Sequence, residues 1–204
     1  MTKPVAVLGG GGHAKVVIDV LRLMRRNIAG VIDPRQQLDL PEGITRIGGD
    51  LSSVEPGTIE LALGVGSIDV GGDNPRFRLF DDAKRAGFHL VTVIHPSAII
   101  ASDLQVGEGC QIMAGCVIQP GVVLGDNVLI NTRSSIDHDC QIASHVHVAP
   151  GVILSGGVKV GSGSHLGTGA IVIQGIQIGR DVIVAAGSTV TRDIANGVRF
   201  RSRP

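Results

Sequence analysis

A histidine between two carboxylates is the feature of this sequence best suited to proton transfer. His138 lies in the segment Asp137-His138-Asp139. A neighbouring carboxylate stabilises the imidazolium and raises the histidine pKa, which makes the imidazole a better proton acceptor near neutral pH. We therefore predict that His138 is a general base and not simply a polar surface residue.

Three further histidines follow within the same half of the chain. His147 and His165 differ by 18 positions, and His145 precedes His147 by two. We interpret His145 and His165 as polar surface residues. An alternative is a zinc site, as in carbonic anhydrases of similar scaffold whose three histidines are shared between subunits, with His138, His145 and His147 as ligands. We favour a site without metal, because zinc hydration chemistry would leave the nucleotide-like N-terminal segment without a purpose.

A glycine loop near the N-terminus could bind phosphate. Gly9-x-Gly11-x-x-Ala14 follows an apolar segment, and Asp33 comes nineteen residues after Ala14. This is a weak form of the dinucleotide fingerprint. The predicted sheet is too short to hold a whole dinucleotide, so the pattern favours a nest of backbone N–H groups for a phosphate or diphosphate. A structural turn without ligand is the alternative.

The elements that must position this loop are strands and helices in alternation. Apolar runs predict strands at residues 5–8, 28–32, 59–63 and 90–93, and helices at residues 15–26 and 76–86. Their order predicts a small Rossmann-like parallel α/β sheet in a domain of residues 1–93. Pro96 marks the boundary after which the spacing of apolar residues changes.

The remainder, residues 94–204, follows a six-residue period. Every sixth residue from Ile94 to Val190 is Ile, Leu or Val, and the fourth residue after each is mostly small. This period predicts a parallel β-helix whose coils contain three hexapeptides, or 18 residues. The residue after the aliphatic is often Gly, Asn or Asp, which predicts a positive φ at that corner.

The 18-residue coil separates the two histidines of greatest interest. His138 and His147 are nine residues apart, half a coil, so they lie on opposite sides of one prism. They can share a site only where two subunits meet. A closed cyclic trimer would bring His138 of one chain towards His147 of the next.

Composition excludes several classes of partner. The chain has 204 residues, zero formal net charge, and neither Trp nor Tyr, which gives no footprint for nucleic acid. No apolar run is long enough for a membrane span. The three cysteines, Cys110, Cys116 and Cys140, share the small-residue column and are predicted to be buried and neither disulfide-bonded nor nucleophilic. We expect a cytoplasmic protein.

The joint pattern resembles a known family over nearly the whole chain. The motifs are the glycine loop ending in His13, Ile94-His95-Pro96-Ser97-Ala98, and Asn131-Thr132 with Asp137-His138-Asp139-Cys140. Together they resemble nucleotide-sugar N-acetyltransferases of the left-handed β-helix family, which acylate 4-amino sugars such as bacillosamine and perosamine. Sialic-acid O-acetyltransferases are close relatives.

The resemblance implies an acetyl-CoA-dependent enzyme of surface-glycan or glycoprotein biosynthesis, a homotrimer with active sites between subunits. By position, His138 matches the family's base and Asp139 the acid that strengthens it. Matches to acetyl-CoA contacts are His147, Thr168 and Ala186. Matches to contacts with the nucleotide-linked amino sugar are Gly11, Gly12, His13, Asp33, Pro34 and Gly64.

Two departures and several alternatives accompany this resemblance. Arg133-Ser134 stands where smaller residues are expected, and the basic C-terminal segment, residues 198–204, lacks the relatives' Gly-x-Pro-Ala-Lys ending. An O-acetyltransferase is the nearest alternative function, and a non-catalytic scaffold is another. The choice between UDP and GDP, and the identity of the sugar, stay open.

Overall fold

The computed structural model describes residues 2–66, 69 and 74–202. Its N-terminal part is a parallel sheet in the order β3-β2-β1-β4. The strands are β1 (Val5–Leu8), β2 (Ile28–Ile32), β3 (Arg46–Gly48) and β4 (Glu60–Leu63). The helices are α1 (Gly12–Leu23) and α2 (Pro75–Arg85), with a short 3₁₀ turn at Leu51–Ser53.

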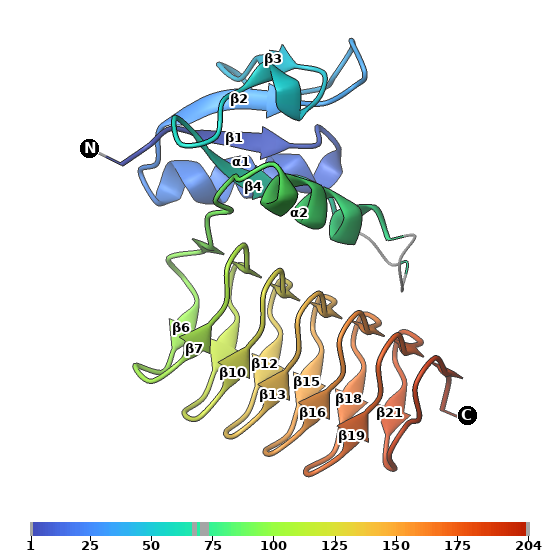
Figure 1. The fold of residues 1–204 in the computed structure, drawn as a ribbon. Helices are drawn as coiled ribbons and strands as arrows, with labels where there is room; N and C mark the ends of the chain where they lie inside the picture. Colours follow the sequence, from blue (N-terminus) through green and yellow to red (C-terminus); the bar gives the residue numbers. More distant parts are fainter. Residues whose placement is uncertain (1, 67–68, 70–73, 203–204) are drawn as a thin grey trace.

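The two helices cover opposite faces of this sheet (Figure 1). Val5 and Val7 of β1 belong to the same apolar cluster as Val17 and Leu21 of α1, whereas Ala6 joins a second cluster with residues of α2. Because side chains alternate along a strand, β1 is buried on both sides. The predicted α/β sheet is confirmed. β3 was missed, since its three residues are half-buried and carry no apolar run.

The C-terminal part is a left-handed parallel β-helix with three flat faces (Figure 1), as predicted. The first face contains β5 (Val93–Ile94), β8 (Gln111–Ile112), β11 (Leu129–Ile130), β14 (His147–Val148), β17 (His165–Leu166), β20 (Ile183–Val184) and β22 (Arg199–Phe200). The second contains β6 (Ile99–Ile100), β9 (Val117–Ile118), β12 (Ser135–Ile136), β15 (Ile153–Leu154), β18 (Ile171–Val172) and β21 (Thr189–Val190). The third contains β7 (Gln105–Val106), β10 (Val123–Leu124), β13 (Gln141–Ile142), β16 (Lys159–Val160) and β19 (Gln177–Ile178).

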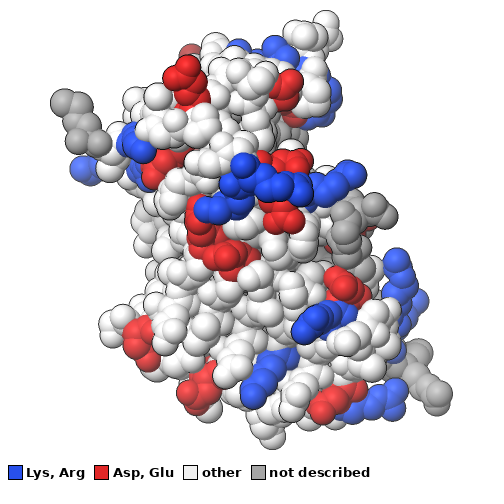
Figure 2. Space-filling model, in the orientation of Figure 1, with Lys and Arg blue, Asp and Glu red and all other residues white. Residues whose placement is uncertain are grey.

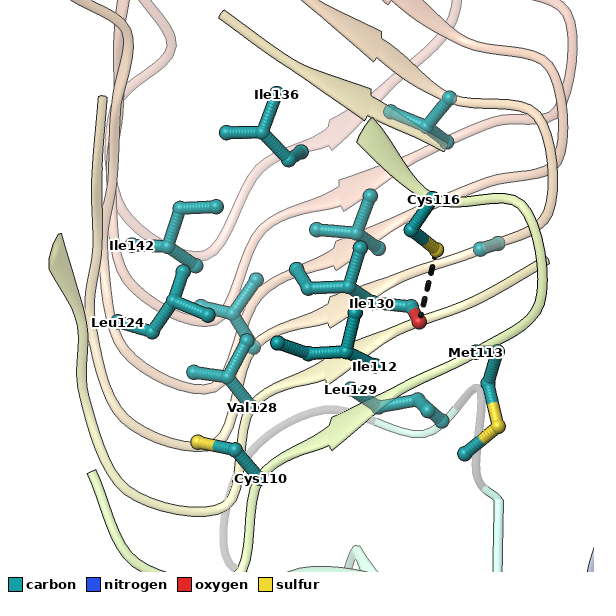
Figure 3. Packing of buried hydrophobic residues seen from close by; sticks show 14 of the residues in the cluster. Cys110, Ile112, Met113, Cys116, Leu124, Val128, Leu129, Ile130, Ile136 and Ile142 are labelled. Atoms are coloured by element: carbon teal, nitrogen blue, oxygen red, sulfur yellow. Dashed lines mark hydrogen bonds between the residues drawn. The ribbon is translucent and has the colours of Figure 1, made fainter. Parts of the chain in front are cut away.

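The interior of the prism is filled by the two predicted columns (Figure 3). All three cysteines are free and buried, as expected, and the Cys116 thiol hydrogen-bonds to the Ile130 carbonyl oxygen at 3.6 Å. Burial raises the pKa of the Cys110 thiol to about 11. Val106 is the one exposed residue of the aliphatic column, with 40% of its surface exposed, and Ile94 and Ile100 before it are half-buried. Val106 lies on β7, the edge strand of the third face, where no earlier coil covers it.

The predicted corner geometry was wrong by two residues. Positive φ angles occur at the third residue after each aliphatic from Val106 to Val184, as at Arg133, Asp139 and His145. The glycines immediately after the aliphatics serve close approach instead. A Cβ atom on Gly167, for example, would lie 2.6 Å from the backbone nitrogen of Ala186 in the next coil. Any side chain there would push neighbouring coils apart.

The sheet and the β-helix are in direct contact. Leu90 still bridges to Leu61 of β4, whereas Val93 of β5 already pairs with Gln111 of β8. One apolar cluster joins α1 to the first coils. The division of the chain between residues 93 and 94 therefore stays a prediction.

On the face of the molecule shown in Figure 2, basic and acidic side chains are interspersed, in keeping with the zero net charge. Across the described residues, no helix has the length and apolar character needed to cross a bilayer.

Candidate active site

His138 lies at the corner between the second and third faces, between β12 and β13. Its Nδ1 is 2.8 Å from Oδ2 of Asp139, and its backbone N–H donates to Oδ1 of Asp137 at 2.9 Å. The hydrogen bond to Asp139, followed by the charge of Asp137, raises the pKa of His138. Because the Asp139 carboxylate accepts a hydrogen bond from Nδ1–H, Nε2 is the nitrogen that carries the basic lone pair. The imidazole is 62% exposed, so a reactant can reach it.

Two glycines in neighbouring coils make room for this pair, and the sequence reasoning missed both. A Cβ atom on Gly156 would lie 2.5 Å from Nε2 of His138, and one on Gly121 would lie 2.5 Å from Oδ1 of Asp139. Each glycine is 18 positions from the residue that it accommodates. Asp139 itself has a φ of 59°, the left-handed conformation that the same corner position also adopts at Arg133 and His145 in neighbouring hexapeptides.

His147 lies on β14 in the first face, opposite the corner that carries His138. The two histidines are on opposite sides of the prism, as predicted, and one chain does not bring them together. The ring of His147 is 4.8 Å from that of His165, and its Nε2 is 3.4 Å from Nδ2 of Asn131. Asn131 is a neighbour that the spacing argument did not identify.

Thr168 and Ala186 occupy the corner between the first and second faces in consecutive coils. Both are exposed, and the backbone of Gly187 donates to the Thr168 carbonyl at 2.8 Å. Because β14, β17 and β20 are neighbours in one face, this corner runs alongside His147. The structure therefore groups the three predicted coenzyme contacts on one side of the prism.

The glycine loop begins α1, with Gly11 as its N-cap and Gly12 as its first residue. Asp33, at the end of β2, accepts the Gly10 backbone N–H at 2.7 Å and a two-point contact from Arg35 at 2.8 and 2.9 Å. The Arg35 guanidinium holds the pKa of the buried Asp33 carboxyl well below its usual range. Asp33 is thus an ionised carboxylate that fixes the loop.

A cavity of about 820 Å³ opens at the carboxyl ends of β1, β2 and β4. Of the predicted substrate residues, Asp33 and Pro34 line it, whereas Gly11, Gly12, His13 and Gly64 do not. Packing explains why residue 64 is glycine, since a Cβ atom there would lie 2.9 Å from the Cβ of Ala14. The carboxyl edge of a parallel sheet is the usual ligand position in α/β folds.

His13, Arg76 and Gln111 form a polar cluster where the sheet meets the β-helix. Nε2 of His13 is 2.8 Å from Oε1 of Gln111, which also accepts from Nη1 of Arg76 at 3.0 Å. Burial, followed by the charge of Arg76, lowers the pKa of His13 to about 4. Sequence reasoning gave no role to Arg76 or Gln111, because their partners are remote along the chain.

The residues of the zinc alternative do not converge within one chain. His145 is not a simple surface residue either, since its ring stacks on Phe77 of α2 at 3.9 Å between centroids. His165 is buried on the first face, so the surface interpretation was wrong for it as well. Within residues 2–66, 69 and 74–202, no three His, Cys, Asp or Glu side chains are grouped as metal ligands would be.

Comparison with known families matches both parts of the chain. Residues 4–70 match the PglD N-terminal domain. Residues 121–156 match the bacterial transferase hexapeptide family, and residues 104–132 and 157–192 match the hexapeptide repeat of succinyl-transferase. A comparison with curated proteins found no match.

Solved structures match over the full length. PerB from Caulobacter crescentus, in complex with CoA and GDP-perosamine, is 36% identical with a TM-score of 0.82, covering 96% of this chain and 92% of that one. This chain belongs to the hexapeptide-repeat acyltransferases with a PglD-type N-terminal domain. The acetyltransferase domain of PglB from Neisseria gonorrhoeae, in complex with acetyl coenzyme A, is 32% identical with a TM-score of 0.87 over 100% of both chains. The family resemblance predicted from the sequence is confirmed, and the chain is an acyltransferase.

Proposed function

We propose that this acyltransferase moves the acetyl group of acetyl-CoA to the amino group of a nucleotide-linked amino sugar. The observation that carries the proposal is the exposed His138–Asp139 pair, a base with its orienting carboxylate. The cavity beside the glycine loop suits the nucleotide, and the related PerB binds CoA together with GDP-perosamine. A UDP-linked or GDP-linked 4-amino sugar is the substrate class we assign.

His138 has the central role in the chemistry that we assign to this site. Acetyl-CoA supplies an activated acyl group, and the neutral amine attacks its carbonyl carbon, forming the C–N bond as the C–S bond breaks. Nε2 of His138 accepts the proton that the amine loses, and that proton can leave with the CoA thiolate. Asp139 accepts the hydrogen bond from Nδ1–H of His138 and stabilises the imidazolium. The buried cysteines support direct transfer without an acyl-enzyme.

The second face of the prism supports the proposed homotrimer. Its outward column, in which positions recur every 18 residues, contains exposed Ile99 (68%), Ile153 (44%) and Ile171 (41%), with half-buried Val117 and Ser135 between the first two. An apolar stripe of this kind indicates an interface. If three copies place their second faces around a threefold axis, the His138 corner of one chain meets the Thr168–Ala186 corner of the next. His147 lies on the face beside that second corner.

The spacing along this corner fits the coenzyme. From β14 to β22 there are three strand spacings, about 14 Å in total. The pantetheine arm has thirteen bonds from sulfur to phosphorus, the length of about four extended residues or ~15 Å. A cavity of about 530 Å³ on the terminal coil is lined by Arg192, Phe200 and Arg201. A thioester near His147 would bring the diphosphate of the coenzyme to these arginines.

The direct test is an assay of CoA thiol release with UDP- and GDP-linked 4-amino sugars. We expect release with one nucleotide and an N-acetyl product that resists hydroxylamine. A hydroxylamine-labile product would identify the O-acetyltransferase alternative. Binding of both ligands without thiol release would contradict the proposal and favour the non-catalytic scaffold.

A further inference from the structure

Gln111 connects three elements of the N-terminal part of the chain, two helices and a strand, to the β-helix. It is the first residue of β8 and is 1% exposed. Its Oε1 is in contact with His13 of α1 and Arg76 of α2, and its Nε2 donates to the Leu63 carbonyl oxygen of β4 at 2.7 Å. A buried amide with all of these contacts has one orientation, and its loss would leave buried polar groups without partners.

The contacts of Gln111 also determine its amide orientation. Arg76 can only donate, so the atom that it contacts is the amide oxygen, and the Leu63 carbonyl can only accept, so its partner is the amide nitrogen. His13 must therefore present a proton on Nε2 to the same oxygen. A neutral imidazole protonated at Nε2 has its acceptor lone pair on Nδ1.

The surroundings of His13 favour the neutral ring. The charged group facing it is the Arg76 guanidinium of α2, and among its described neighbours no carboxylate contributes to its titration. The Cys110 thiol, which interacts with Arg76, is kept protonated by burial. Towards Gly66, a Cβ atom on that glycine would lie 3.4 Å from Cγ and 3.7 Å from Nδ1 of His13, in ordinary van der Waals contact with the ring.

Gln111 also lies on the same face as His147. Gln111 pairs with Leu129, which pairs with His147, so two strand spacings, about 10 Å, separate the two positions. One hexose with a hydrogen bond at each end spans such a distance. A nucleotide sugar anchored at the glycine loop would therefore bring its sugar between His13 and the acyl donor.

We propose that Gln111 is a positioning residue for the acceptor substrate. It holds His13 as the neutral Nε2–H tautomer, so that Nδ1 accepts a hydrogen bond from a hydroxyl or amine of the nucleotide-linked sugar. This inference rests on the proposed function. In this role the neutral His13 ring accepts a hydrogen bond from the sugar, and it does not bind the diphosphate as a cation.

Two substitutions test this role. Gln111→Glu keeps the length but puts a carboxylate beside His13, and Gln111→Met keeps the length without hydrogen bonds. Gln105→Glu on β7, an exposed residue at the same strand position, is the matched control. We expect the KM for the nucleotide sugar to rise about tenfold in both Gln111 variants, with the KM for acetyl-CoA unchanged. In Gln111→Glu alone, it should rise further as the pH falls from about 8 to about 6, because the carboxylate favours the imidazolium.

Equal changes in both KM values, or a sugar KM within about twofold of wild type, would overturn the proposal. Nitrogen NMR of the ¹⁵N-histidine-labelled wild type gives a second measurement that needs no stable variant, with the His13 signals assigned from a His13→Gln sample. We expect the Nε2–H tautomer without titration down to about pH 5. An Nδ1–H tautomer or titration near neutral pH would also overturn it. Failure of acetyl transfer in the wild type would instead refute the proposed function, and the NMR result would still decide the tautomer.

Discussion

Mixing two inactive variants tests whether the active site belongs to two chains. His138→Ala removes the base, and His147→Ala removes the residue on the opposite side of the prism. If each site combines His138 of one chain with His147 of the next, neither variant alone has an intact site. A mixed trimer regains one wherever a chain with intact His138 precedes a chain with intact His147.

The expected magnitude follows from this geometry. In trimers assembled at random from equal amounts of the two variants, a given interface has the required order in about one case in four. The mixture should therefore show about one quarter of the wild-type activity. The chains would be co-expressed with two different affinity tags, purified through both, and assayed for CoA thiol release. Double selection excludes trimers of one variant and raises the expected fraction to about one third.

Each variant mixed with wild type controls for assembly, and sedimentation gives the oligomeric state. An activity of the mixture equal to that of the separate variants, with trimers intact, would refute the shared site. A monomeric and active wild type would refute it without any mixing.

Three further predictions concern the His138 corner and the arginines of the terminal coil. Asp139→Asn should lower the His138 pKa, so the acidic limb of the kcat profile moves to lower pH while the maximal rate falls; an unmoved limb would separate Asp139 from the base. Gly156→Ala should lower kcat at least tenfold with unchanged trimer content, because the new Cβ occupies the position of the His138 ring; a wild-type rate would show that the ring can move freely. The double variant Arg192→Gln/Arg201→Gln should raise the KM for acetyl-CoA about tenfold without affecting acetyl-pantetheine, which lacks the phosphates; equal effects on both donors would remove these arginines from coenzyme binding.

The periodic parts of the fold were predictable because burial imposes a period on them. The aliphatic column from Ile94 to Val190 specifies the prism, and the uninterrupted apolar run of β1 reflects burial by helices on both faces. β3 has no such period because its residues are half-buried. We predicted positive φ at the wrong residue because we attributed Gly107 and Gly125 to a tight corner. These positions lack a side chain because the backbone of the next coil lies too close to them.

The candidate site was predictable only where chemistry lies within one short segment. His138 and Asp139 are adjacent, so their pairing could be inferred from local sequence. Gln111 is 98 positions from His13 and 35 from Arg76, and no local pattern connects them. Such contacts arise from the way in which α1 and α2 pack on the first coils, which a one-dimensional period does not specify.

Once the coil length is known, however, part of this gap closes. A residue at a corner of the prism faces the residues 18 positions before and after it, so a bulky functional side chain restricts the residues allowed there. His138 requires a small residue at 156, and the Asp139 carboxylate requires one at 121; both positions are glycine. The same rule links Gln111, Leu129 and His147 in one line on the first face. The 18-residue spacing therefore predicts which positions must have small side chains if a catalytic pair is to fit at a corner. In a β-helix of this type that lacks glycine 18 residues after its corner histidine, we expect that the histidine ring cannot lie over the neighbouring coil.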